Sequence, residues 1–295
     1  LGLFYNKKVM ADNGWSVPTT ITEFEKMADE MVSKGIVPIG AGNSNWRPAN
    51  EWHVTLALNS IAGPDNLQKA LTGEMSWTEK PFLDSVNALK RWWDKGYFGD
   101  DYFSISTEQM ISNLAEGMSA MAPTGSWSFG DVPTYFADQL DNVGFAGFPS
   151  GEGVAYPIYA LGIGTTFSIA SKAENPEGAA EVIDFMFDDE FYTAMNNEWQ
   201  GEWNLPLRDL SGIKLSEDVL PEYTESMAAL ASAIDKNQYG YTSWTFMPPN
   251  TNSYVVSGIE EVWLDSISPE QFLAELDEIF QRELAEGKAF EIPAR

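Results

Sequence analysis

The chain has 295 residues, 44% of them hydrophobic and 21% charged, a composition typical of a soluble globular protein with room for two domains. Its formal net charge of −27, from 44 acidic and 17 basic residues, argues against nucleic acid and anionic membrane surfaces as partners. No apolar run reaches the roughly eighteen residues that a membrane span needs.

Strands and helices alternate through the first half of the chain. A strand is predicted over residues 1–6, and because Leu1 opens inside it, we expect upstream sequence, with any secretion signal, to be missing. Apolar residues at helical spacing between a Thr20 cap and Gly35 predict a helix over 23–34. The other elements predicted before residue 150 are strands at 36–39, 118–122 and 143–148 and helices at 51–61, 81–95 and 107–116. This alternation indicates an α/β fold with a largely parallel sheet.

The pattern changes after Gly151. Residues 159–170 are rich in glycine and threonine, which suits a strand or a segment that crosses between domains. A helix then begins at Asn175-Pro-Glu177. From residue 217 onward the chain is predicted to be mostly helical, and it ends in an amphipathic helix over 269–285.

Four short segments follow one another in a characteristic order. They are Leu3-Phe-Tyr-Asn-Lys7 with Pro18-Thr-Thr-Ile-Thr-Glu-Phe24; Leu114-Ala-Glu-Gly-Met-Ser-Ala-Met121 with Gly125-Ser-Trp127; Phe167-Ser-Ile-Ala-Ser-Lys172 with Asn175-Pro-Glu-Gly-Ala-Ala180; and the stretch from Gly201 to Leu205-Pro-Leu-Arg208. Ile21 stands where tryptophan is common in the first motif. Together, across nearly the whole chain, they resemble the family-1 extracellular solute-binding proteins of ABC importers, the family of the maltose-binding protein.

The resemblance implies an α/β, periplasmic-binding-protein-like two-lobe fold of type II, with the first part of the N-terminal lobe absent. Residues 1–157 would be the first part of the C-terminal lobe, 158–205 a partial N-terminal lobe with crossing segments, and 206–295 the helical part of the C-terminal lobe. The missing block would be about 100–150 residues, the size of a lobe. We therefore expect exposed apolar side chains in the partial lobe, at Phe167, Ile169, Val182, Ile183, Phe185, Met186 and Phe187.

The same resemblance implies a function without covalent chemistry. The protein would bind an extracellular solute, a mono- or oligosaccharide, between two lobes and deliver it to ABC transporter permease subunits. It would be monomeric and extracytoplasmic, either periplasmic or lipid-anchored at the outer face of the membrane. Hinge closure around the ligand would bend the crossing segments near residues 156–166 and 201–208.

Sugars present hydroxyl edges and flat C–H faces, so their sites combine aromatic rings with carboxylate, amide or guanidinium groups. The chain has eleven tryptophans, several of them in polar loops. The resemblance places Trp127 at a stacking position, Trp46 and Arg47 in a sugar-contacting loop, and Trp244 on a further aromatic platform. The other candidate ligand contacts are Glu51 at the start of a helix, Asn252 and Tyr254 after the platform, and Trp203 near the crossing.

Two other classes stay open. A secreted glycoside hydrolase would also be rich in tryptophan, but any pair among 44 acidic residues is uninformative, and no nucleophile or zinc motif occurs. A carbohydrate-binding surface module would normally be all-β, against the strand–helix alternation. With no cysteine, one histidine (His53) and no EF-hand spacing around Asp100-Asp101, the sequence predicts no metal and no cofactor. Which solute binds is left open, peptides and polyols included.

Overall fold

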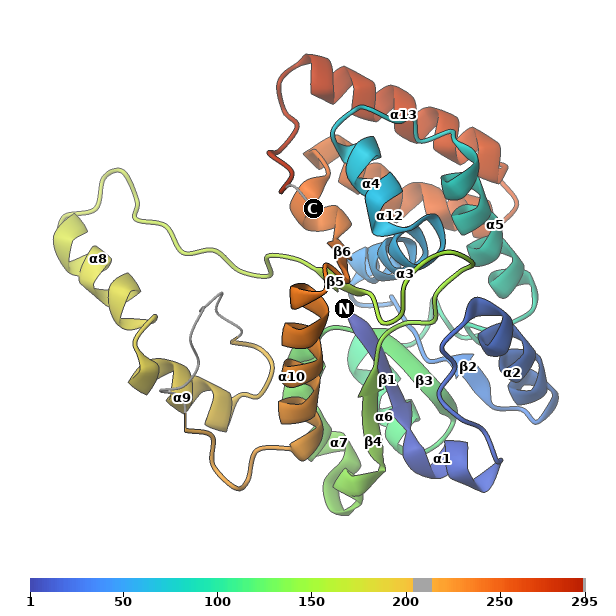
Figure 1. The fold of residues 1–295 in the computed structure, drawn as a ribbon, viewed down its shortest axis with the longest axis horizontal. Coiled ribbons are helices and arrows are strands. Elements are labelled where there is room, and N and C mark those ends of the chain that lie inside the picture. The colour runs from blue at the N-terminus through green and yellow to red at the C-terminus, as the bar shows by residue number, and fades with distance from the viewer. Residues whose placement is uncertain (204–213, 294–295) are drawn as a thin grey trace.

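The structure is a computed structural model that describes residues 1–203 and 214–293 (Figure 1). The strands are β1 (Gly2–Asn6), β2 (Val37–Ile39), β3 (Ser119–Thr124), β4 (Val143–Ala146), β5 (Tyr159–Leu161) and β6 (Tyr239–Tyr241). The α-helices are α1 (Lys7–Asp12), α2 (Ile21–Ser33), α3 (Asn50–Ala57), α4 (Pro64–Leu71), α5 (Lys80–Asp94), α6 (Thr107–Ala115), α7 (Val132–Phe136), α8 (Pro176–Phe185), α9 (Asp189–Glu198), α10 (Pro221–Asp235), α11 (Ser243–Phe246), α12 (Pro249–Trp263) and α13 (Pro269–Ala285). Short 3₁₀ or π turns are η1 (Arg47–Ala49), η2 (Leu58–Ala62), η3 (Ser126–Gly130) and η4 (Ala137–Asn142).

The main sheet has four strands in the order β2-β3-β1-β4. Only β2 and β3 run parallel; β1 is antiparallel to both of its neighbours. The prediction of a largely parallel sheet is therefore wrong. Alternating strands and helices indicate a sheet covered by helices, but they do not fix the direction of a strand whose partners lie more than a hundred residues away in the chain.

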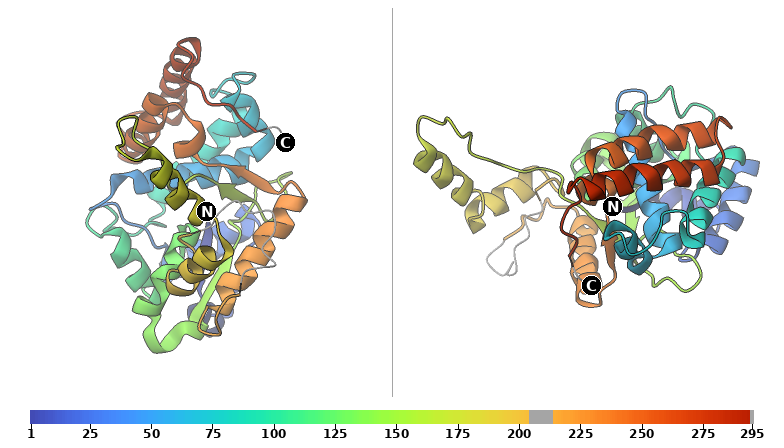
Figure 2. Two further views of the ribbon diagram at one scale, coloured as in Figure 1. Left: turned by 90° about the vertical axis from the view of Figure 1, so that its left-hand side faces the viewer. Right: turned by 90° about the horizontal axis from the view of Figure 1, so that it is seen from above.

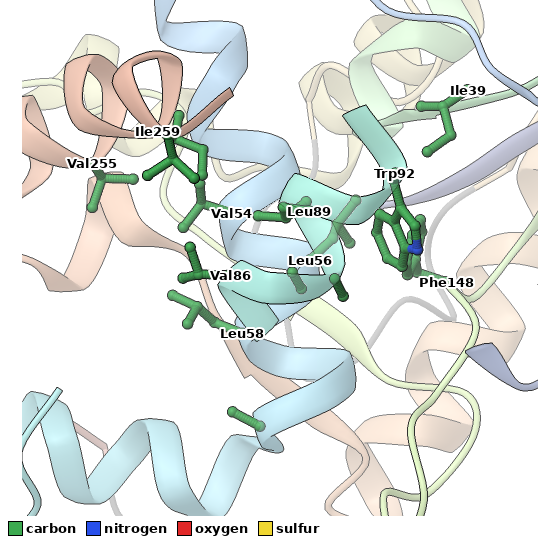
Figure 3. Close-up of a cluster of buried hydrophobic side chains, with 14 of the residues drawn as sticks. Ile39, Val54, Leu56, Leu58, Val86, Leu89, Trp92, Phe148, Val255 and Ile259 are labelled. Atoms are coloured by element: carbon green, nitrogen blue, oxygen red, sulfur yellow. The ribbon is translucent and has the colours of Figure 1, made fainter. Parts of the chain in front are cut away.

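Helices α3, α5, α12 and α13 pack on one another although α3 and α12 are about 200 residues apart in sequence, and α3 joins this group to strand β3 of the sheet (Figure 1). Figure 3 shows part of this core, where Val54, Leu56, Leu89 and Ile259 are buried side by side. His53 belongs to it as well, with its ring 4.9 Å from that of Phe98. Burial lowers the pKa of His53 to about 3, so the side chain is a neutral core residue at pH 7.

A second core lies where α6, α7 and α10 meet the sheet. It is built around Phe4, Phe129 and Tyr223, with the ring of Phe129 4.7 Å from Phe4 and 5.4 Å from Tyr223. Helix α10 lies against β4, so residues after 213 return to the body of the molecule (Figure 1). The short strand β5 also pairs with β6, in parallel, across 80 residues of sequence.

The region from 162 to 203 is here called the arm, and its first part, up to α8, stands away from the rest of the molecule in Figure 1 and in the right view of Figure 2. The end of the arm reaches α10, where the hydroxyl of Tyr223 donates to Asn196 of α9. The arm contains α8 and α9, and none of the residues of α8 is buried. The exposed fraction is 50% for Phe167, 57% for Val182 and 47% for both Phe185 and Phe187. The prediction of exposed apolar side chains in this region is confirmed for five of the seven residues, whereas Ile183 and Met186 are partly covered.

Four helices, α1, α4, α7 and α9, were not expected from the sequence. The predicted helix at 51–61 divides into α3 and the π turn η2, where Asn59 donates to the carbonyl oxygens of Thr55 and Tyr241 and accepts from the backbone N–H of Tyr241. An amide that satisfies both backbone groups of Tyr241 fixes the end of β6 against α3. Among the helices of the described residues, none combines the length and the apolar character of a membrane span.

Candidate functional site

The first element of the site is the loop that follows β2. It ends in the turn η1, whose preceding residue, Trp46, is 44% exposed. The guanidinium of Arg47 donates twice to Glu260 of α12, from Nε to Oε1 over 2.8 Å and from Nη2 to Oε2 over 2.5 Å. Oε1 also accepts from the amide of Asn50, at 2.6 Å. These bonds tie the loop to α12 and so hold Trp46 at the surface.

Helix α3 follows directly and carries Glu51 and Trp52, both only 4% exposed. The ring of Trp52 lies 5.2 Å from Trp46 and 5.5 Å from Trp127. Trp52 is therefore a buried indole that packs between the two more exposed indoles of Trp46 and Trp127. Offset and tilted contacts at such distances stabilise aromatic clusters.

Trp127 comes from η3, directly after β3, and it is half-buried. Its ring covers Gly125, where an added Cβ would come within 2.2 Å of the ring carbons. A side chain at position 125 would therefore displace the indole. The backbone of Gly125 has φ −100° and ψ 175°, values that any residue adopts. Glycine is therefore needed here only because the indole ring of Trp127 lies so close to the backbone.

Trp244 comes from α11, after β6, and its ring lies 6.4 Å from Trp127. Its indole N–H donates to the carbonyl oxygen of Ile163, at 3.1 Å. The backbone N–H of Ile163 in turn donates to the hydroxyl of Thr245, at 2.8 Å. The start of the arm is therefore bonded to the same short helix that presents Trp244.

Polar groups lie beside these rings. The carboxylate of Glu51 accepts from Ser243, at 3.4 Å, and from Asn252 of α12. Burial raises the pKa of Glu51, and the bonds from Asn252 and Ser243 oppose that shift. The other amide atom of Asn252, Oδ1, is buried and has no partner among the described residues. A hydroxyl or a water would satisfy it.

The structure thus brings five of the predicted site residues, Trp46, Trp127, Trp244, Glu51 and Asn252, to one place around Trp52. The four indoles of Trp46, Trp52, Trp127 and Trp244 form a continuous set, here called the tryptophan group, with Glu51 and Asn252 beside it. Flat apolar rings next to a carboxylate and an amide suit a ligand with C–H faces and hydroxyl edges. The two best-defined pockets of the described residues are lined by none of these tryptophans and leave no room for a water molecule.

Three predicted residues lie differently. Arg47 is engaged by Glu260 as described, and its role toward Trp46 is indirect. Tyr254 stacks on Phe272 of α13 at 5.5 Å and donates to Glu275, on the side of α12 away from Asn252, since residues two apart on a helix point about 200° apart. Trp203 lies in the arm, 5.5 Å from both Phe167 and Phe191.

Sequence reasoning missed two contributors. Ser243 donates to Glu51, and the carbonyl of Ile163 accepts from Trp244. Ser243 could have been found from the sequence because it directly precedes Trp244.

The second crossing segment, predicted over 201–208, falls mostly outside the described residues. Its first residue, Gly201, lies so close to Ser126 that an added Cβ would come within 1.9 Å of the Ser126 carbonyl oxygen. The arm therefore contacts η3, the turn that carries Trp127.

Comparison with known proteins identifies the family. The model of the bacterial extracellular solute-binding proteins matches residues 1–192. The multiple sugar-binding protein of Streptococcus mutans is 24% identical over 195 residues, which is 63% of this chain and 44% of that protein. The chain thus matches less than half the length of this curated relative.

Solved structures agree on the fold. A chitin oligosaccharide binding protein superposes with a TM-score of 0.81 at 20% identity, over 97% of this chain and 70% of that one. A putative binding protein of Bacillus subtilis gives 0.74 at 16% identity, over 98% and 71% of the two chains. A sugar transporter protein of Bacillus licheniformis in complex with stachyose gives 0.74 at 15% identity, over 95% and 71%. These matches confirm the predicted α/β two-lobe fold class, and with the match over residues 1–192 they show that the chain belongs to the bacterial extracellular solute-binding proteins.

Proposed function

We propose that this protein captures an oligosaccharide outside the cytoplasm and delivers it to the permease subunits of an ABC importer. The observation that carries the proposal is the tryptophan group, three of whose four indoles are partly exposed beside Glu51 and Asn252. Relatives named for binding multiple sugars and chitin oligosaccharides, and one seen with stachyose, support the substrate class. The family consists of binding proteins, which supports capture without catalysis.

Within this proposal, residues 1–157 and 206–295 belong to one lobe and 158–205 to a second. The packing of α12 and α13 on α3 and α5, and the separate position of the arm, support this division (Figure 1). Closure of the two lobes would press the ligand against the tryptophan group, and the bend would fall in the crossing segments on either side of the arm. Binding energy would stabilise the closed form.

A titration tests the site. We expect neutral oligosaccharides such as triacetylchitotriose, raffinose and stachyose to change the tryptophan fluorescence of the protein, and calorimetry to give the affinity. Trp127→Ala and Trp244→Ala should each weaken binding about tenfold, which corresponds to ~1.4 kcal/mol of lost ring contact. Trp15→Ala is the matched control, because Trp15 is equally half-buried but lies against Lys34, whose Nζ is 4.9 Å from its ring. Equal losses in Trp15→Ala and Trp127→Ala would contradict the proposed site.

A further inference from the structure

Positive charge is absent from most of the chain that builds the tryptophan group. No lysine or arginine occurs between Arg47 and Lys69, between Lys95 and Lys172, or between Lys236 and Arg282. The first stretch carries Trp52, the second Trp127, and the third Trp244 with Asn252. All three stretches contain carboxylates. The stretch between Lys95 and Lys172, which carries Trp127, is several times longer than the average spacing of 17 basic residues in a chain of 295.

Within residues 1–203 and 214–293, the cation found beside the group is Arg47, and its guanidinium is already paired. Its guanidinium makes a two-bond contact with Glu260, and the side chain of Glu260 is only 14% exposed. This contact uses two of the five N–H groups and neutralises the positive charge of the guanidinium, so a second anion would gain little electrostatic attraction from it. An acidic ligand would have to compete with a protein carboxylate that is held in place by Asn43 and Asn50 as well.

Negative groups, by contrast, lie near Trp46 and Trp127. Next to Trp46, the amide of Asn45 donates to Glu108 over 2.8 Å. Four residues after Trp127 lies Asp131, where partial desolvation and then the charge of Glu108 raise the pKa. Desolvation and then the charge of Asp131 raise the pKa of Glu202 in the same way. In the part of the chain that the structure describes, no cation contributes to either shift.

From this charge arrangement we infer that the tryptophan group accepts uncharged saccharides and rejects those that carry a carboxylate. The inference rests on the proposed function and names the charge class of its ligand. Hydroxyl groups can donate to Glu51 and to Oδ1 of Asn252, whereas a sugar carboxylate has only acceptor oxygens to offer. Like charges brought together at a binding surface are repelled, and the wrong partner is thereby suppressed.

The test compares matched ligands on the full chain. The probes are cellotriose, raffinose and triacetylchitotriose, each beside its uronate form, in which a primary alcohol is oxidised to a carboxylate. We expect every uronate to bind at least about tenfold more weakly than its neutral parent at low salt. The ratio should shrink at 1 M salt, where the screening length falls from ~10 Å at 0.1 M to ~3 Å.

A pair of variants locates the effect. Glu260→Gln removes the carboxylate that occupies Arg47, so uronate binding should improve several-fold relative to neutral binding. Glu261→Gln is the control: it makes the same change of net charge one residue further along α12, on an exposed side chain outside the two-bond contact with Arg47. Glu261 acts on Arg47 through its charge alone and less than Glu260 does, so the ratio of neutral to acidic affinity should stay within about twofold of the parent chain.

The outcomes are distinct. If neutral sugars bind and their uronates bind as tightly, the charge inference is wrong and the proposed function stands. If uronates bind more tightly than neutral sugars, the inference is likewise overturned. If no saccharide of either kind binds, the proposed function fails and the inference with it. A salt-dependent preference for neutral sugars that Glu260→Gln reduces and Glu261→Gln preserves would support both.

Discussion

Helices α5 and α8 begin in the same way, with a proline in the first turn, and both have an apolar side, yet they lie in opposite surroundings. Six residues of α5 are buried, and Phe82 is completely covered between neighbouring helices. No residue of α8 is buried, and Phe185 is 47% exposed. The comparison shows that apolar periodicity determines that a helix forms with one apolar face, whereas the surroundings determine how much that face contributes to stability.

The largest effect should come from the same substitution made in both helices. Phe82→Ala removes a fully buried ring and should lower the free energy of unfolding by about 3–5 kcal/mol. Phe185→Ala removes a half-exposed ring whose main contact is Phe191, 5.4 Å away, and should cost less than about 1 kcal/mol. Urea unfolding measures both changes. Losses of similar size would mean that the face of α8 is covered in solution.

A second effect, of intermediate size, concerns acid sensitivity in the body. The pKa of His53 is lowered to about 3 by burial, against about 6.5 in an unfolded chain, so below pH 6.5 the unfolded state takes up the proton and the folded state does not. This one group should therefore remove about 2 kcal/mol of stability between pH 7 and pH 5. His53→Gln should remove that part of the slope.

Unfolding curves at pH 7 and pH 5 for both proteins provide the measurement. The arm contains no histidine, so a variant there such as Phe185→Ala should keep the full pH dependence and serves as the control. An unchanged slope in His53→Gln would show that the ring is not buried in its neutral form. It would also weaken the contrast between the buried body and the exposed arm, because α3 would then be open to solvent.

The smallest effect on stability is expected where the arm contacts the body, at η3. Gly125→Ala would place a methyl group within 2.2 Å of the Trp127 ring and force that ring to move. The backbone there accepts alanine, so the free energy of unfolding should change by less than about 1 kcal/mol. Oligosaccharide affinity should nevertheless fall about three- to tenfold, since ring position decides the stacking contact.

A double-mutant comparison isolates the cause. In a Trp127→Ala background, Gly125→Ala has no ring to displace and should leave the affinity unchanged. An equal loss in both backgrounds would show that the methyl group acts through the backbone of η3 instead. Calorimetry with a neutral oligosaccharide supplies both measurements.

Much of the fold follows from sequence patterns. The Thr20 cap, confirmed by its bond from the backbone N–H of Glu23, set the start of α2, and Ser268 did the same for α13. The exposure of the arm was also predicted, because an apolar helix needs a cover that the sequence did not supply. The antiparallel direction of β1 was not predicted, since it depends on β3 and β4, more than a hundred residues away.

The site was predicted only in part, because here too the partners of some side chains lie far away in the chain. Trp46, Trp127 and Trp244 stood out as aromatic residues in polar loops, and the structure brings them together through Trp52. What the sequence could not reveal is how a long side chain is used. Arg47 and Tyr254 are residue types that bind sugars, but the first is paired with Glu260 and the second stacks on Phe272. Both partners come from distant parts of the chain.

The bond from the Trp244 indole to the carbonyl of Ile163 has an optical consequence. Indole emission depends on the polarity around the ring and on the partner of its N–H. The backbone N–H of Ile163 is held by Thr245 of the same helix, so only a bend that separates Ile163 from α11 would break the indole bond. If the proposed closure of the lobes bends the chain there, a variant in which Trp244 is the sole fluorescent indole would report that movement without an attached dye.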